Sequence, residues 1–231
     1  RRKWGRRLLW GLLLLAILLN NFQLWQIKQG ILWSEDNNRA YYRAAFGKTK
    51  VTAADIAAYD LTFRQPDPDK LELVGGLHYN GFEDTTRLKA FSQKAYQGSY
   101  SFPLNGAITY SPGYSAWVDS IGLRAGDWIG VRFFARATRE VHSLRKMAKM
   151  AVVFDQGNEN LFWWGLRIEN KLDNPKQNLW SNKPGVWREV RFWVPVPEDL
   201  PPGARLKVHG WQPHPNTIYL DEMEVTHWRE K

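Results

Sequence analysis

The stretch Trp128-Ile-Gly-Val-Arg-Phe-Phe-Ala-Arg136 has a period of two. Successive side chains of an extended chain point to opposite faces. One face therefore carries Ile129, Val131, Phe133 and Ala135, and the other carries both arginines. This pattern predicts a β-strand with one face toward a core and the other toward solvent.

The same period recurs at other places downstream of Leu71. Residues 161–169 place one apolar set on a single face: Phe162, Trp164, Leu166 and Ile168. Residues 186–194 do the same with Val186, Val190, Phe192 and Val194. More strands are predicted at 150–155, 205–211 and 217–225, separated by turns rich in Gly, Pro and Asn. Residues 138–149 predict a short basic helix or a loop. We therefore predict an all-β jelly-roll sandwich.

The chain begins with a different kind of segment. Five positive charges, including Arg6 and Arg7, precede the apolar residues 8–19. Twelve apolar residues are fewer than the roughly 20 that a span needs and suit the core of a cleaved signal peptide. However, no small-x-small cleavage site follows, and Trp4 and Trp25 lie 21 residues apart. That spacing is about 31 Å of helix, and Trp at both ends is typical of membrane interfaces. We predict a transmembrane α-helix.

The charges around this helix predict its orientation. Lys and Arg beside a membrane segment stay in the cytoplasm. The N-terminus is therefore expected in the cytoplasm, the helix in the cytoplasmic (inner) membrane, and the rest in the periplasm or outside the cell. Asn20 and Asn21 lie near the outer interface, where amides need water, headgroups or a protein neighbour. The helix is thus expected to be an anchor, and the Asn pair suggests docking against other membrane helices.

Charge and cysteine content exclude other classes. The formal net charge is +9, but five of these charges lie within residues 1–7, which leaves +4 for the rest of the chain. The basic excess therefore reflects membrane topology more than nucleic-acid binding. The chain has no Cys, so disulfides and thiolate metal sites are excluded.

Three parts are predicted: a basic cluster and membrane helix at 1–33, a juxtamembrane connector at 34–76, and a sandwich at 77–231. The connector is expected to be partly helical. Ser34 is a candidate start for a helix carrying Tyr41 and Tyr42. Thr52 and Asp55 form a candidate capping box for a helix ending near Tyr59. The connector either packs against a partner or is a solvated stalk.

Five segments between residues 77 and 227 resemble, in the same order, carbohydrate-binding modules with a galactose-binding-like sandwich. The segments are Asn80-Gly-Phe-Glu-Asp84, Ala95-Tyr-Gln-Gly-Ser-Tyr-Ser101, Leu123-Arg-Ala-Gly-Asp127 with the strand to Ala137, Trp187 with the strand to Val194, and Ile218-Tyr-Leu-Asp-Glu222. The resemblance implies a β-sandwich that binds carbohydrate.

The resemblance also implies a structural Ca²⁺. The matching ligands are Glu83 and Asp221, completed by backbone oxygens near Gly98. Ca²⁺ takes six to eight oxygen ligands, and two carboxylates would offset its charge. The alternative is that both residues simply end strands and bind water or a nearby Arg.

One set of large side chains is predicted to form a glycan-binding or partner-binding face. Its members are Trp128, Arg132, Phe134, Arg136, Trp163, Arg167, Arg191, Trp193 and Trp211. Aromatic rings bind the apolar faces of sugars, and Arg binds hydroxyls and carboxylates, which favours an anionic polymer. Trp and Arg are also enriched in protein interfaces, and large aromatics also pack internally. The three interpretations remain open.

No catalytic centre is predicted, and a jelly roll that cleaves polysaccharides with paired carboxylates is the remaining alternative. The acidic segment Asp221-Glu-Met-Glu224 lies on a predicted strand, where Asp221 and Glu222 would point to opposite faces. The five His show no ligand spacing, and neither a nucleophile elbow nor a phosphate loop is present. We predict a non-catalytic membrane protein that presents a glycan-binding sandwich outside the cytoplasm. The alternative is an accessory subunit of a membrane complex.

Overall fold

The structure is a computed structural model of the full chain. It describes residues 2–32, 38–52, 55, 60, 65–86, 90–141, 144–157, 159–172 and 184–231. The chain divides into two compact units, Arg1–Thr62 and Phe63–Lys231, which are described separately.

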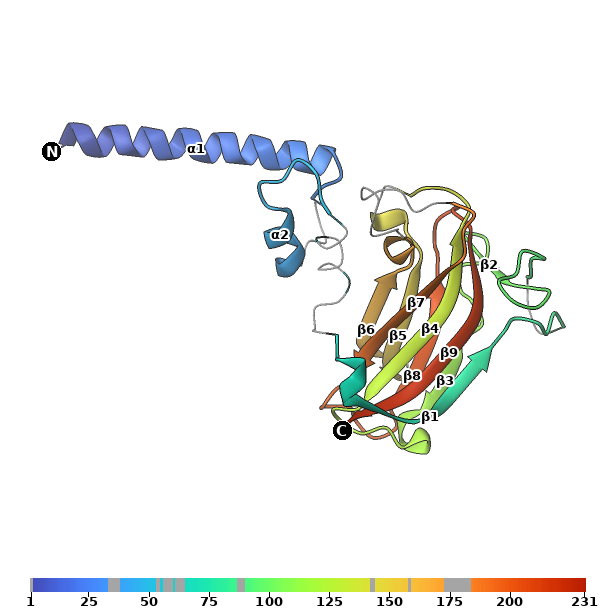
Figure 1. The fold of residues 1–231 in the computed structure, drawn as a ribbon. Helices are drawn as coiled ribbons and strands as arrows, with labels where there is room; N and C mark the ends of the chain where they lie inside the picture. The colour runs from blue at the N-terminus through green and yellow to red at the C-terminus, as the bar shows by residue number, and fades with distance from the viewer. Residues whose placement is uncertain are drawn as a thin grey trace. The chain divides into compact units, whose positions relative to one another are not determined.

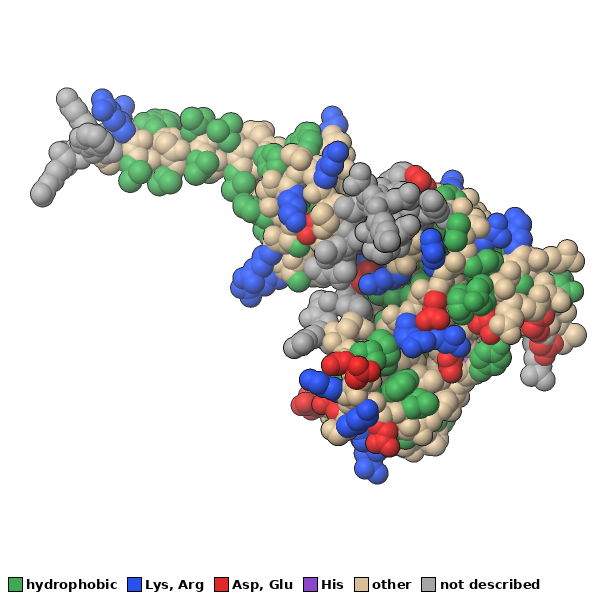
Figure 2. Space-filling view, in the orientation of Figure 1, with side chains coloured by type: hydrophobic (Ala, Val, Ile, Leu, Met, Phe, Trp, Pro, Cys, Tyr) green, Lys and Arg blue, Asp and Glu red, His purple; other side chains and the backbone are tan. Residues whose placement is uncertain are grey.

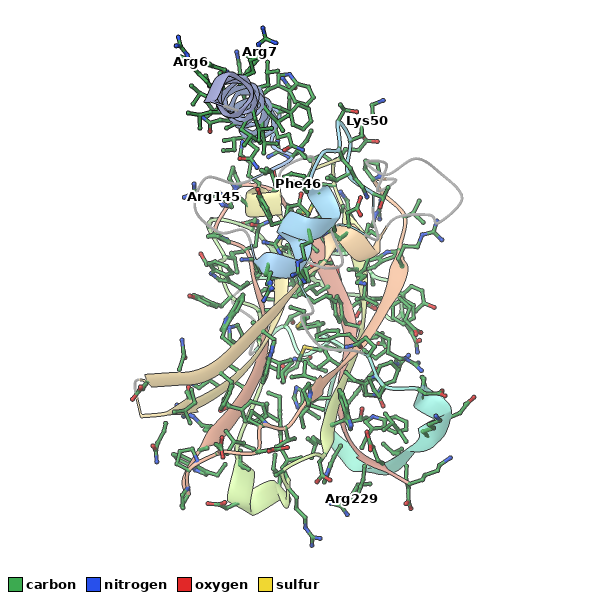
Figure 3. All side chains as sticks on the ribbon, turned by 90° about the vertical axis from the view of Figure 1, so that its left-hand side faces the viewer. Arg6, Arg7, Phe46, Lys50, Arg145 and Arg229 are labelled. Atoms are coloured by element: carbon green, nitrogen blue, oxygen red, sulfur yellow. The ribbon has the colours of Figure 1, made fainter. Side chains whose placement is uncertain are left out.

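The first unit contains a long exposed helix, α1 (Arg2–Lys28), which ends before Gly30 with its left-handed φ of 72°. Its segment Gly5–Lys28 is, by length and composition, the one helix among the described residues that is apolar enough to cross a membrane. Figure 2 shows Lys and Arg at the start of α1 and hydrophobic side chains along the side in view, and in Figure 3 Arg6 and Arg7 project from the same helix.

A short helix, α2 (Arg39–Ala45), follows in the same unit (Figure 1). Asn38 caps it, because its side chain accepts a hydrogen bond from the Tyr41 amide at 2.7 Å. The predicted helix carrying Tyr41 and Tyr42 is therefore present but begins at Arg39, and Ser34 lies outside the described residues.

Hydrogen bonds fasten α2 to the end of α1. The buried Gln26 side chain donates to the carbonyls of Ala45 and Lys48, at 3.1 and 2.7 Å. The Tyr41 hydroxyl, also buried, donates to the carbonyl of Ile31 at 2.6 Å. The first part of the predicted connector is thus folded onto the helix and is not a solvated stalk.

The predicted capping box is present at Thr52 and Asp55. The Thr52 amide donates to the Asp55 carboxylate at 2.7 Å, and the Asp55 amide donates to the Thr52 hydroxyl at 3.2 Å. Lys48 pairs with the same carboxylate at 2.8 Å. The predicted end of this helix, at Tyr59, lies outside the described residues.

The second unit is a β-sandwich of two antiparallel sheets (Figure 1). Within the described residues, the five-stranded sheet has the order β1 (Leu71–Asn80), β9 (Ile218–Glu230), β4 (Trp128–Ala137) and β7 (Arg188–Pro195), with β2 (Phe102–Leu104) also on β9. The four-stranded sheet has the order β3 (Tyr114–Trp117), β8 (Arg205–Trp211), β5 (Lys149–Gln156) and β6 (Glu159–Arg167). Short 3-10 turns lie at Pro68–Lys70, Val118–Ile121, Leu144–Lys146 and Glu169–Lys171.

The strand order identifies the type of sandwich. From β3 onward the chain crosses between the sheets after every strand except β5, which pairs with β6. Such crossings between two four-stranded antiparallel layers are typical of a jelly roll, and β2 is an addition to them. The predicted fold class is confirmed.

The core between the sheets confirms most of the predicted alternation. Ile129, Val131, Phe133 and Ala135 of β4 are completely buried. On β7, Val190, Phe192 and Val194 are buried as predicted. The prediction that Val186 shares this face is wrong, because Val186 precedes the strand and is 37% exposed.

Two predicted boundaries also differ. The strand β1 begins at Leu71, so residues 71–76 belong to the sandwich and not to the connector. Its Gly75 and Gly76 weaken the alternation that marks a strand. At the other end, β9 extends past the predicted Val225 to Glu230.

Candidate functional site

The nine residues predicted to form one face are divided between the two sheets. Those on β4 and β7 belong to the five-stranded sheet: Trp128, Arg132, Phe134, Arg136, Arg191 and Trp193. Those on β6 and β8 belong to the four-stranded sheet: Trp163, Arg167 and Trp211. The prediction of a single face is wrong, because a period of two separates core from surface but does not say which sheet a strand joins.

On the five-stranded sheet, two of the three predicted arginines are paired with carboxylates and the ring of Phe134 is covered. Arg132 Nε lies 2.8 Å from Glu224, and Arg191 lies 3.2 Å from Glu189. The ring of Tyr96 stacks on Phe134, with centroids 3.6 Å apart. The covered ring of Phe134 favours the internal-packing interpretation, whereas Arg132 and Arg191 pair with carboxylates at the surface of this sheet.

Trp193 on β7 is also part of the packing. Its side chain is buried and meets the ring of Trp228 edge-on, with centroids 6.4 Å apart. Its amide and carbonyl are both bonded by the side chain of Gln65, each at 2.9 Å. Trp128 lies opposite Trp228 in the β4–β9 register. The guanidinium of Arg136 lies close to Gly185.

The four-stranded sheet carries an open hollow of about 320 Å³ on the face turned away from the core. The register explains which residues meet there: Val153 of β5 lies between Trp163 of β6 and Lys207 of β8. The lining consists of Tyr110, Val153, Asp155, Asn160, Trp163, Lys207, His209 and Trp211. We call this surface the hollow.

Aromatic rings surround the hollow. Trp163 and Trp211 meet at 90°, with centroids 6.4 Å apart, and the ammonium of Lys149 lies 5.3 and 4.8 Å from these two rings. Trp163 is 43% exposed and Tyr110 is 61% exposed. The indole of Trp163 lies across Gly165, where a Cβ would come within 2.1 Å of the ring.

Polar groups occupy the floor of the hollow. The buried carboxylate of Asp155 accepts a hydrogen bond from Arg205 Nε at 3.3 Å and contacts the ammonium of Lys207. Burial lowers the pKa of His209 below its usual value, and the charge of Lys207 lowers it further. His209 is therefore expected to be neutral at neutral pH, when its two ring nitrogens offer one donor and one acceptor.

Sequence reasoning found only part of this site. Of the residues predicted for the binding face, Trp163 and Trp211 line the hollow, whereas Arg167 is 6% exposed and does not belong to the lining. Their role in binding stays a prediction. The missed residues include Lys149, Asp155, Asn160 and Lys207. The alternation of β8 carried a usable signal, because it places Lys207, His209 and Trp211 on one face.

The predicted Ca²⁺ ligands lie in an environment of hydrogen-bond donors. Glu83 Oε1 accepts from the amides of Ser99 and Tyr100, at 2.9 and 3.0 Å. Asp221 Oδ2 accepts from the amides of Tyr96 and Gln97, and its Oδ1 accepts from its neighbour Glu222. Ca²⁺ needs oxygen ligands where these amides lie. Among the described residues, no group of three acidic, His or Cys side chains could hold a metal. This arrangement does not fit a shared Ca²⁺ site.

The carboxylates of the acidic segment have structural partners. Glu222 accepts from the Tyr79 hydroxyl at 2.7 Å, Glu224 pairs with Arg132, and Asp221 is completely buried beneath residues 96–97. A β-bulge lies here, with Glu222 at φ 50°, and it interrupts the alternation that the sequence predicted.

Comparison with solved structures finds carbohydrate-binding modules. The CBM22-1 xylan-binding domain of Paenibacillus barcinonensis Xyn10C is 14% identical, with coverage of 61% of this chain and 81% of that domain and a TM-score of 0.37. The C-terminal family 22 module of Clostridium thermocellum Xyn10B is 12% identical, with coverage of 70% and 96% and a TM-score of 0.36. A family 16 carbohydrate-binding module is 12% identical, with coverage of 57% and 79% and a TM-score of 0.34. The chain is similar to these modules. No family model matches it, and no curated protein matches its sequence.

Proposed function

We propose that the chain is a non-catalytic, membrane-anchored protein that binds a glycan in the hollow of its four-stranded sheet. The observation that carries this proposal is the set of aromatic rings, exposed Tyr110 and Trp163 and half-buried Trp211, around a hollow whose other lining is mainly polar. Sugars have apolar ring faces and polar edges. A site for them therefore needs flat apolar surfaces next to hydrogen-bonding groups.

The proposed anchor is α1. With Arg6 and Arg7 in the cytoplasm, the helix would cross the inner membrane and hold the sandwich on the periplasmic or extracellular side. A glycan of the cell envelope would then be bound close to the membrane surface. The support is the length and apolar composition of α1.

The test is binding of the full chain, held in nanodiscs of neutral lipid, to a panel of neutral and acidic polysaccharides. Trp163→Ala and Tyr110→Ala are expected to weaken binding at least about tenfold, which corresponds to ~1.4 kcal/mol for an interfacial aromatic. Tyr79→Ala is the matched control, because Tyr79 is equally exposed but lies on the five-stranded sheet. Folded protein that binds no member of the panel would contradict the proposal.

A second candidate function is that of an accessory subunit in a membrane complex. It is favoured by α1, whose apolar side chains are exposed and which carries the adjacent amides of Asn20 and Asn21 within its length. Asn21 donates to the carbonyl of Ile17 at 2.9 Å within the helix, so Asn20 is the better candidate for a bond to a neighbouring helix. Purification in mild detergent followed by native mass spectrometry tests this function. A monomer without a co-purifying chain would exclude it.

A further inference from the structure

The hollow has an unusual balance of charge and of hydrogen-bonding groups. Among the residues that the structure describes, three cations, Lys149, Arg205 and Lys207, lie in or beside it, and the lining has one carboxylate, that of Asp155. Asp155 belongs to the floor and is 3% exposed, whereas the side chains of Arg205 and Lys207 are 33% and 32% exposed. A ligand therefore meets the cations before it meets the carboxylate.

Both carboxylate oxygens of Asp155 already face cations. Its Oδ1 accepts from Arg205, and its Oδ2 lies against Lys207. Ammonium and guanidinium groups are donors only, so the groups that face a ligand are mostly donors. A neutral sugar offers hydroxyls that must both donate and accept, but a carboxylate is an acceptor alone. The donor-rich hollow is complementary to a carboxylate.

The ammonium of Lys149 places a positive charge next to the tryptophan rings on which a sugar would stack. Its ammonium lies within about 5 Å of the centroids of both Trp163 and Trp211, a distance at which a cation is attracted to an aromatic face. A pyranose ring placed against either indole would bring its ring substituents near this ammonium. In a uronic acid, one of those substituents is a carboxylate.

We infer that the hollow selects acidic glycans, and specifically uronic-acid residues, whose sugar ring stacks on the tryptophan pair while the carboxylate faces Lys149 and Lys207. This inference rests on the proposed glycan binding and adds the substrate class. His209, beside Lys207 in the same lining, would then serve the hydroxyl groups of the ring.

The experiment compares acidic polysaccharides with their own neutral forms. Polygalacturonate, alginate and hyaluronan are each tested before and after chemical reduction of their carboxylates to hydroxymethyl groups, with the full chain in neutral-lipid nanodiscs. At least one acidic polymer is expected to bind ten times more tightly than its reduced form. The preference is expected to shrink as salt is added, because salt screens partly exposed charges.

Substitutions of single lysines test the contribution of their charge to binding. Lys149→Met and Lys207→Met keep most of each side chain's apolar length and are expected to lower the acidic preference at least threefold each, while Lys149→Arg keeps it. Arg191→Met is the matched control, since Arg191 is a half-exposed cation on the other sheet. If reduced and acidic polymers bind equally, or if only neutral polymers bind, the inference is overturned and glycan binding stands. If nothing binds, both are overturned.

Discussion

At the residue scale, a single glycine decides where the most exposed tryptophan of the hollow lies. Gly165 and Trp163 are two positions apart on β6, so they share a face, and the indole covers the glycine. Any side chain at position 165 would occupy the place of the ring.

We expect Gly165→Ala to weaken glycan binding about as much as Trp163→Ala does. The added methyl displaces an indole that is 43% exposed and therefore has room to swing away. The strand itself should be retained, with a change in stability of no more than about 1–3 kcal/mol. Titration with the polysaccharide that binds best measures the effect. Gly75→Ala is the control, because that strand glycine has no atom within 4 Å of its Cβ position; equal affinity of the two variants would contradict the expectation.

A buried ionic cluster joins the start of β4 to the end of β9. Asp127 is 2% exposed and accepts from His227 Nε2 and from Arg229 Nε, both at 2.7 Å. Arg229 lies at the opposite end of the sandwich from Arg145 in Figure 3. Burial raises the pKa of Asp127, but the bonds from Arg229 and His227 and from the Arg124 amide outweigh burial and lower the pKa to about 2.

This pKa predicts how stability depends on pH. A carboxyl whose pKa is lower in the folded than in the unfolded protein stabilises the fold above its unfolded value of about 4, and the contribution is lost as the pH falls toward 2. Its size is about 2 kcal/mol. Asp127→Asn should therefore lower the Tm at pH 7 and lower it much less at pH 2.5, as measured by thermal melts of both proteins across this range. A constant difference in Tm would show that the ionised carboxylate is not the stabilising group.

At the element scale, the segment 96–100 folds around two carboxylates. Its backbone amides bond Glu83 and Asp221, and Gly98, with φ 70°, lets Glu83 approach so closely that a Cβ would lie 2.3 Å from Oε1. The carboxylates act here as acceptors for a tight turn. Bonds between amides and charged acceptors of this kind are stronger than neutral hydrogen bonds.

We expect the Tm of the protein to be the same in CaCl₂ and in EDTA, because the amides occupy the positions where Ca²⁺ would need oxygen ligands. Glu83→Gln should lower the free energy of unfolding by about 1–3 kcal/mol in both solutions, since the charged acceptor is lost. A saturable rise of the Tm with Ca²⁺ in the wild-type protein, absent from Glu83→Gln, would indicate that the segment rearranges around a metal.

The elements that could be predicted from sequence are those with regular alternation. On β4 and β8 the sequence alternation indicates both the buried and the exposed residues, because each strand has one face in the core. The predicted binding face failed for a different reason. In this jelly roll the chain crosses between the sheets after most strands, so Arg132 on β4 and Trp163 on β6 have the same pattern but lie on different sheets. The bulge at Glu222 could not be predicted from the sequence either, because an inserted residue shifts the period of the strand without changing its composition.

The Gln26 side chain makes two of the hydrogen bonds that attach α2 to α1, and the side chains of Gln23 and Tyr41 make others. Gln26→Leu would leave the carbonyls of Ala45 and Lys48 without this donor in a buried place, at a cost of about 1–3 kcal/mol each. We expect faster hydrogen exchange of the amides of residues 42–48 in the nanodisc-bound chain. Asn21→Leu is the control, because the Asn21 bond lies within α1. Unchanged exchange in Gln26→Leu would show that the hydrogen bonds of Tyr41 to Ile31 and of Gln23 to Tyr42 suffice.

At the scale of the whole molecule, the absence of Cys makes the predicted topology directly measurable. The Glu198→Cys variant, changed at an exposed turn of the sandwich, should react with a membrane-impermeant maleimide on cells whose inner membrane is intact. The Gly5→Cys variant should react only after that membrane is permeabilised, because Arg6 and Arg7 hold it in the cytoplasm. The reverse pattern of labelling would overturn the orientation.

The hydrogen bonds between the Gln65 side chain and the backbone of Trp193 affect how copies of this chain can associate. The strand β7 is an edge strand of its sheet. An edge strand exposes unpaired peptide groups, with which a strand of another molecule can pair. The amide of the Gln65 side chain binds both peptide groups of Trp193, as a neighbouring strand would. If α1 holds the chain in a membrane as proposed, copies of the chain meet there at high local concentration. The segment that leads into the sandwich thus blocks, at Trp193, a route to edge-to-edge aggregation.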